Sequence, residues 1–177
     1  MALLLDEHEG ADERREHEID VLDPFRDGAG RILLVCSPGG HLLQMRALRP
    51  AWQDHEATWV TLDGADVGRL LADDEVILAH GPTNRSLGKL LRNLVLAWRV
   101  VRRERPDAIL STGAALALPF FLAGRLHGCR LVYVESLTRT RSLSLTGRLV
   151  YPLAHAFFVQ WPDATRRRKA RFVGSLM

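Results

Sequence analysis

The chain has few of the features that mark a disulfide-bonded, metal-binding or membrane-spanning protein. Its 177 residues include only two cysteines, Cys36 and Cys129, and no paired-cysteine spacing of a zinc site occurs. Both cysteines fall in apolar runs, so we expect reduced, buried thiols in a cytoplasmic protein, with no disulfide and no metal. No apolar stretch reaches the roughly 20 residues that span a bilayer. Met1–Leu5 is followed directly by acidic residues, unlike a signal peptide, so any membrane contact is expected to be peripheral.

Two signatures of nucleotide and nucleic-acid binding are also missing. The chain has no G-x-G-x-x-G fingerprint, which counts against a NAD-dependent oxidoreductase. No aromatic residue is interleaved with the basic run Arg166–Lys169, which counts against nucleic acid as a partner.

Charge is distributed unevenly along the chain. Residues 1–30 carry ten acids against three arginines, whereas residues 31–177 carry 21 basic residues against 11 acids. The first thirty residues have no sustained apolar period, so we interpret them as an acidic, disordered extension. The basic remainder, from Arg31 to Met177, is expected to form one domain that favours an anionic partner such as phosphate or acidic lipid.

Apolar runs and amphipathic segments alternate along this domain, which predicts an α/β fold with a doubly wound parallel sheet. The expected strands are Ile32–Cys36, Ala57–Leu62, Glu75–Ala79, Asp107–Ser111, Arg130–Glu135, Ala156–Gln160 and Arg171–Gly174. The expected helices are His41–Gln53, Ala65–Ala72, Leu87–Arg105, Ala114–His127 and Leu145–His155. Pro119 is expected to kink the fourth of these helices.

Polar clusters follow three of the expected strands: Ser37–His41, Ser111–Gly113 and Glu135–Ser136. Ligands of open parallel sheets bind beyond the carboxyl ends of the strands, so the three clusters predict a site at one rim.

The loop Ser37-Pro38-Gly39-Gly40-His41 carries the strongest local signal. Two glycines permit positive φ angles and close approach of an anion, and the next helix would add free N–H groups and its dipole. The loop is either a phosphate cradle or a tight strand-to-helix turn. His41 is either a general base, because imidazole accepts a proton near neutral pH, or a capping or packing residue.

The other two clusters each carry two interpretations. Thr112 is expected to cap the helix that follows while Gly113 clears space for a ligand, although helix capping alone also explains the threonine. Glu135 ends an apolar strand. It either bonds sugar hydroxyls or orients His41, or it is a solvated strand end.

The segment Leu87–Arg105 is a basic amphipathic helix. Leu94, Trp98 and Arg102 are its candidate membrane contacts, because tryptophan and basic residues suit an anionic bilayer surface. The alternative is a helix that covers the sheet and exposes a polar face. The run Arg166–Lys169 is either a solvated face or a contact for phosphate, lipid or a partner subunit.

Five short motifs in fixed order carry a family resemblance: Leu33–His41, Ser111–Gly113, Tyr133–Ser136, Phe158–Trp161 and Phe172–Ser175. As a set they are similar to the PssD family of bacterial polysaccharide glycosyltransferase subunits. The eukaryotic relative is the membrane-anchoring subunit of the UDP-N-acetylglucosamine transferase of dolichol-linked glycan assembly. The resemblance implies a Rossmann-like domain equivalent to the amino-terminal half of a GT-B glycosyltransferase such as MurG.

The resemblance also implies a function, that of the acceptor-binding and membrane-recruiting subunit of a two-subunit, inverting hexosyltransferase. A separate, PssE-like subunit would bind the UDP-sugar, and the chain would be inactive alone and need no cofactor. The acceptor would be a polyprenyl-diphosphate-linked saccharide at the cytoplasmic face of the membrane. The implied roles are the catalytic base for His41, the acceptor sugar for Glu135, and the acceptor diphosphate for Ser37, Gly39, Gly40, Thr112 and Gly113.

One departure concerns membrane attachment. Many members of that family begin with a hydrophobic anchor, whereas this chain begins with acidic residues. The helix around Trp98 therefore becomes the expected peripheral attachment. The alternative function is a non-catalytic scaffold that only tethers and activates the donor-binding subunit.

Overall fold

A computed structural model describes residues 30–81, 87–164, 170–172 and 174–176. The strands are β1 (Arg31–Val35), β2 (Glu56–Leu62), β3 (Glu75–Ala79), β4 (Ala108–Ser111), β5 (Arg130–Val134), β6 (Ala156–Val159) and β7 (Ala170–Phe172). The α-helices are α2 (Gly40–Ala47), α3 (Val67–Leu70), α4 (Leu87–Glu104), α5 (Ala117–Leu126) and α6 (Leu145–Val150), with 3₁₀ turns at Arg49–Ala51 and Pro162–Ala164. The predictions for the acidic extension and for Arg166–Lys169 lie outside the described residues.

The seven strands form one parallel sheet in the order β3-β2-β1-β4-β5-β6-β7. The order reverses between β1 and β4, where Leu33 pairs with Ile109. This reversal is the switch point at which doubly wound sheets bind ligands, beyond the carboxyl ends of the strands. The predicted fold class is confirmed.

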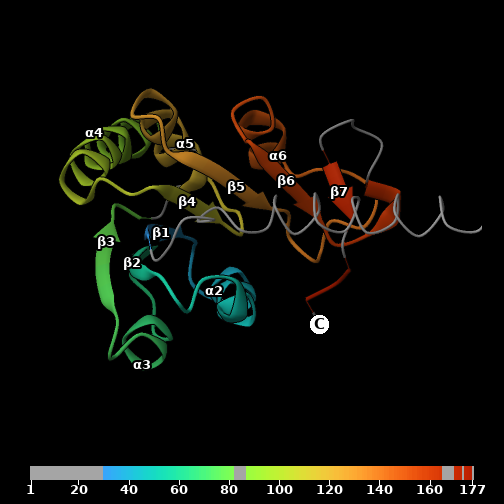
Figure 1. Ribbon diagram of the computed structural model, residues 1–177, viewed down its shortest axis with the longest axis horizontal. Helices are drawn as coiled ribbons and strands as arrows, with labels where there is room; N and C mark the ends of the chain where they lie inside the picture. Colours follow the sequence, from blue (N-terminus) through green and yellow to red (C-terminus); the bar gives the residue numbers. More distant parts are fainter. Residues whose placement is uncertain (1–29, 82–86, 165–169, 173, 177) are drawn as a thin grey trace, which may run out of the picture.

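Helices cover both faces of the sheet. Figure 1 shows α4, α5 and α6 on one side and α2 and α3 on the other. Leu33 and Val35 belong to the core beneath α4–α6, whereas Ile32 and Leu34 belong to the core beneath α2 and α3. Every residue of β1 after Arg31 is therefore buried on one face or the other, which explains the unbroken apolar run.

All five helices are shorter than predicted; α3 covers only Val67–Leu70, α6 ends at Val150 and α4 ends at Glu104. The other two differ at a proline. The first ends at Ala47 and gives way to a 3₁₀ turn that contains Pro50, because proline has no N–H to continue the helical ladder. The other begins at Ala117, three residues later than predicted. Pro119 consequently lies in the first turn, where its missing N–H costs no bond, so the predicted kink is wrong.

Candidate functional site

The loops after β1, β4 and β5 meet at the carboxyl edge of the sheet around an open pocket of about 740 Å³. Its lining includes His41, Ala114, Glu135, Arg139 and Ser144. The lining takes in His41 from the first predicted cluster, Glu135 and Ser136 from the third, and Ala114, which directly follows the second. Ser37, Gly39, Gly40, Thr112 and Gly113 are not among the lining residues.

His41 is held in a defined orientation by the β4 loop. Its Nδ1 lies 2.8 Å from the carbonyl oxygen of Thr112. A carbonyl only accepts hydrogen bonds, so Nδ1 carries the proton and the neutral ring keeps its lone pair at Nε2. This tautomer leaves Nε2 as the nitrogen that can accept a proton.

Thr112 also donates a hydrogen bond to His41. Its side chain is fully buried, and its hydroxyl donates to the carbonyl oxygen of His41 at 2.8 Å. The prediction that Thr112 caps the next helix is wrong, because α5 begins at Ala117 and has no side-chain cap. Direct binding of a diphosphate by this buried hydroxyl is likewise not supported. Thr112 instead locks the β4 loop to the start of α2.

Gly113 lies against the His41 ring. Its φ of 121° is open to glycine but not to side-chain-bearing L-residues. A Cβ at this position would lie 2.8 Å from His41 Cε1 and 3.0 Å from Nδ1, which is closer than carbon atoms pack. Glycine is therefore required at this position for two reasons: the positive φ angle and the close contact with the His41 ring.

Ala114, next in the chain, has a φ of 70° and lines the pocket. A left-handed conformation costs an alanine about 1–2 kcal/mol. Backbone strain of this kind is concentrated at functional sites.

The glycine loop after β1 already binds an anionic group from the chain itself. The Gly39 N–H donates to a carboxylate oxygen of Asp66 at 2.7 Å, and Gly39 has a φ of 77°. Gly39 and Gly40 are exposed and Ser37 is half-buried. The space beside both glycines is open, so a second anion has room to approach this loop.

Glu135 is not a solvated strand end. Its side chain is 1% exposed. One carboxylate oxygen accepts from the Ser136 N–H at 3.0 Å. The other accepts from the Ser144 N–H at 2.9 Å and from the Ser144 hydroxyl at 3.1 Å.

These bonds correct the two functional interpretations of Glu135. The carboxylate holds the loop 136–143 and the start of α6, and in the described structure it is His41–Thr112 bonding, not Glu135, that orients the imidazole. Although Glu135 borders the pocket, both of its carboxylate oxygens are already engaged by Ser136 and Ser144. Gly147 is packed directly against it, since a Cβ there would overlap the Glu135 Oε2 atom.

Arg139 is a site residue that sequence reasoning missed. It is the one arginine or lysine among the described residues that line the pocket, beside the hydroxyl-bearing Ser136, Thr138 and Thr146. The main-chain N–H of Arg139 donates to the Ser136 carbonyl at 2.9 Å in a tight turn. The sequence offered a signal, because Thr138-Arg139-Thr140-Arg141 directly follows the Glu135 cluster.

A second missed feature is a buried amide network beneath the pocket. The Gln160 side-chain nitrogen donates to Gln44 Oε1 at 2.8 Å and to the Glu135 carbonyl at 2.9 Å. Gln44 Oε1 also accepts from the Leu137 N–H at 3.2 Å, and Gln160 Oε1 accepts from the Leu176 N–H at 3.1 Å. The network joins α2, the β5 loop and the end of β6.

The thiol nearest the site is inert. Burial, with a smaller contribution from Asp66, raises the pKa of Cys36 to about 12, so its thiolate is not formed near neutral pH. Burial raises the pKa of Cys129 as well. Both cysteines are free, as the sequence predicts.

The predicted membrane contacts lie on α4, outside the pocket. Leu94 is 36% exposed, Trp98 is 44% exposed, and Arg102 is exposed beside them. Ala97, Val100 and Val101 are buried against the sheet, so the helix both covers the core and presents an apolar outer face. Across the described part of the chain, no helix combines the length and apolar character needed to cross a bilayer.

Comparison with known proteins places this geometry in context. Residues 79–176 match the model of a family described as "Oligosaccharide biosynthesis protein Alg14 like". The UDP-N-acetylglucosamine transferase subunit ALG14 of Eremothecium gossypii is 40% identical over 127 residues, which are 64% of this chain and 55% of that protein. The subunit alg14 of Schizosaccharomyces pombe is 40% identical over 75 residues, 39% of this chain and 36% of that protein. The chain thus spans about half the length, or less, of these relatives.

Solved structures share the fold. MurG of Acinetobacter baumannii superimposes with a TM-score of 0.68 at 19% identity, over 81% of this chain and 45% of MurG. The UDP complex of Staphylococcus aureus MnaA superimposes with a TM-score of 0.65 at 16% identity, over 83% of this chain and 45% of MnaA. In both cases the match takes in less than half of the other protein.

Proposed function

Because the chain belongs to the Alg14 family, we propose that it is the acceptor-binding and membrane-recruiting subunit of a two-subunit glycosyltransferase. The enzyme moves a sugar from a UDP-sugar to a polyprenyl-diphosphate-linked saccharide. The observation that carries the proposal is a built pocket at the switch point of a fold that matches under half of MurG. A donor-binding, PssE-like subunit supplies the remainder.

His41 is the base of the proposed reaction. The acceptor hydroxyl oxygen attacks the anomeric carbon of the donor sugar, the bond from that carbon to UDP breaks, and Nε2 takes the hydroxyl proton. The Nδ1–Thr112 bond supports this role because it fixes the tautomer and the ring plane. Direct displacement inverts the anomeric centre and leaves no sugar on the enzyme.

The acceptor diphosphate binds between the glycine loop and Arg139. Gly39 and Gly40 offer open space beside Ser37 at the start of α2, and the Arg139 guanidinium supplies a bidentate donor to phosphate oxygens. Thr112 and Gly113 act indirectly, by holding His41. Glu135 is a positioning residue as well, because its carboxylate fixes the loop that carries Arg139.

Membrane recruitment uses the outer face of α4, with Leu94, Trp98 and Arg102 at the cytoplasmic surface of the bilayer. Exposed apolar side chains also occur on α5 and α6, which follow α4 on the same side of the sheet (Figure 1): Leu126 and Leu145 are 75% and 74% exposed. A face with large exposed apolar residues beside arginines is typical of peripheral attachment to anionic lipid.

Co-expression with the donor-binding subunit tests the proposal. Sugar transfer to a polyprenyl-diphosphate saccharide should require both chains and should fall sharply in His41→Ala. An Arg69→Ala control, on the exposed surface of α3, should retain full transfer. Full transfer in His41→Ala and Arg139→Ala, with both chains still required, would instead identify a scaffold.

A further inference from the structure

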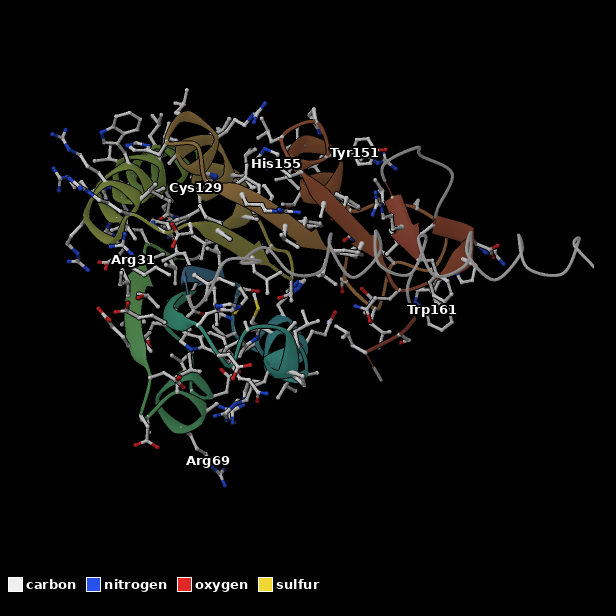
Figure 2. All side chains as sticks on the ribbon, viewed as in Figure 1. Arg31, Arg69, Cys129, Tyr151, His155 and Trp161 are labelled. Atoms are coloured by element: carbon white, nitrogen blue, oxygen red, sulfur yellow. The ribbon has the colours of Figure 1, made fainter. Side chains whose placement is uncertain are left out.

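A second basic pocket lies at the opposite edge of the sheet from His41. It has a volume of about 610 Å³ and is bounded by the beginnings of β1, β4 and β5 and by the carboxyl-terminal ends of α4 and α5. Figure 2 shows Arg31 and Cys129, both of which line it, on the α4 side of the molecule. The proposed transfer reaction uses none of this pocket.

Its lining is strongly cationic. Arg31, Arg102 and Arg105 contribute three guanidinium groups, against a single carboxylate, Asp107. That carboxylate accepts from the main-chain N–H of Arg31 at 2.9 Å. Within the described residues no ion pair engages any of the three arginines. Unpaired guanidiniums that share one cavity favour a doubly charged or bidentate anion, and phosphate is the best match to their planar geometry.

The pocket also has an aromatic wall that reaches the outer surface. The rings of Trp98 and His127 meet edge to face, with centroids 4.5 Å apart. Trp98 lines the pocket and at the same time belongs to the exposed apolar face of α4. Leu126, which precedes His127 at the end of α5, is 75% exposed. Tryptophan at such a junction is typical of the level of the lipid headgroups.

Arg105 has an unusual backbone conformation at this place. Its φ of 46° is in the left-handed region, which costs a non-glycine residue about 1–2 kcal/mol. The N–H of Arg105 still donates to the Val101 carbonyl at 2.9 Å, so the strain lies at the end of α4, at the rim of the pocket. A left-handed residue directly after a helix is a common way for helices to end.

We infer that this pocket binds the phosphate headgroup of an anionic membrane lipid. The lipid is favoured over a free phosphate because the cavity is continuous, through Trp98, with the apolar face that contacts the bilayer. The inference rests on the proposed membrane contact. It adds that attachment is selective for a phosphate-bearing anionic lipid rather than driven by apolar insertion alone.

Vesicle sedimentation of the full chain tests the site, with vesicles of phosphatidylcholine alone or mixed with phosphatidylglycerol. The unmodified chain should prefer the anionic vesicles. The double variant Arg31→Gln/Arg105→Gln should lose about tenfold or more in apparent affinity for them, at about 1 kcal/mol for each arginine near the surface. Arg102→Gln, on the exposed surface of a helix and harmless to folding, should lose about fivefold.

The matched control is Arg49→Gln/Arg69→Gln, which removes the same charge from the opposite face and should change affinity by less than twofold. If the control lost as much affinity for anionic vesicles as the double variant, net charge and not this pocket would explain the binding, and the proposal would be overturned. Equal binding of both vesicle types would overturn the headgroup site and leave the membrane contact standing. Binding to neither type would overturn both. If soluble inorganic phosphate fully displaced the chain from anionic vesicles, the pocket would be a site for free phosphate, and the proposal of a lipid headgroup would be overturned.

Discussion

At the scale of single residues, the account depends on the tautomer of His41. Thr112 accepts from Nδ1, so the proton-accepting nitrogen is Nε2. His41→Asn places an amide N–H at the position of Nδ1, so it can reproduce the donation to the Thr112 carbonyl, but it offers no basic nitrogen. We expect kcat with the donor subunit to fall by about a hundredfold or more, with little change in the KM for the acceptor. Steady-state kinetics of the complex check this, and an unchanged kcat would remove His41 from the mechanism.

Gly113→Ala should disable the site without altering any group that bears chemistry. The new methyl group would displace the His41 ring and add backbone strain, so we expect a loss of activity together with a stability loss of about 1–3 kcal/mol.

Gly174→Ala is the matched control for that variant. Gly174 has nearly the same φ, 118° against 121°, but nothing lies within 4 Å of its missing Cβ. Its replacement should cost stability and leave transfer intact. Equal activity losses in the two variants would show that backbone strain, and not contact with His41, is responsible.

At the scale of elements, the amide network joins α2 to the loop after β5 and to the end of β6. Gln160→Leu removes the donor to Gln44 and to the Glu135 carbonyl, both at buried positions. It also leaves the half-buried Leu176 N–H without its acceptor. Unpaired buried polar groups cost about 1–3 kcal/mol each. We therefore expect the free energy of unfolding to fall by about 2–4 kcal/mol in urea titrations. Gln53→Leu, at an exposed position, should stay within about 0.5 kcal/mol of the unmodified chain.

The sequence predicts the elements well but not the contacts between their loops. The pure apolar run in β1 and the polar residues at the strand ends were sufficient to place the site at the switch point. The Thr112–His41 bonds join residues 71 positions apart, and the Asp66–Gly39 bond spans 27 positions. No local pattern encodes such pairs, and for the same reason the burial of Glu135 beneath Ser144 could not be foreseen.

At the scale of the whole molecule, buried ionisable groups make the free energy of unfolding vary with pH in the alkaline range. Burial raises the pKa of Cys36 to about 12 from 9.0, and it raises the pKa of Tyr133 above its ordinary value of 10.0. Between pH 9 and 12 the Cys36 thiol ionises in the unfolded chain only. Stability should therefore fall with rising pH, by up to about 1.4 kcal/mol per pH unit for each such group.

Urea titrations at several pH values measure this dependence. In Cys36→Ala the fall between pH 9 and 10 should be shallower than in the unmodified chain, whatever the stability of the variant at pH 7. An identical slope in both proteins would mean that Cys36 is not shielded from solvent in the native state.

The central claim is a division of labour: this chain holds the lipid-linked acceptor, and another chain holds the donor. Isothermal titration calorimetry with the purified chain alone tests it most directly, with UDP and a polyprenyl-diphosphate saccharide as separate ligands. The account predicts saturable binding of the diphosphate lipid, weakened by Arg139→Ala, and no binding of UDP. Tight binding of UDP by the isolated chain, with sugar transfer and no second subunit present, would contradict it.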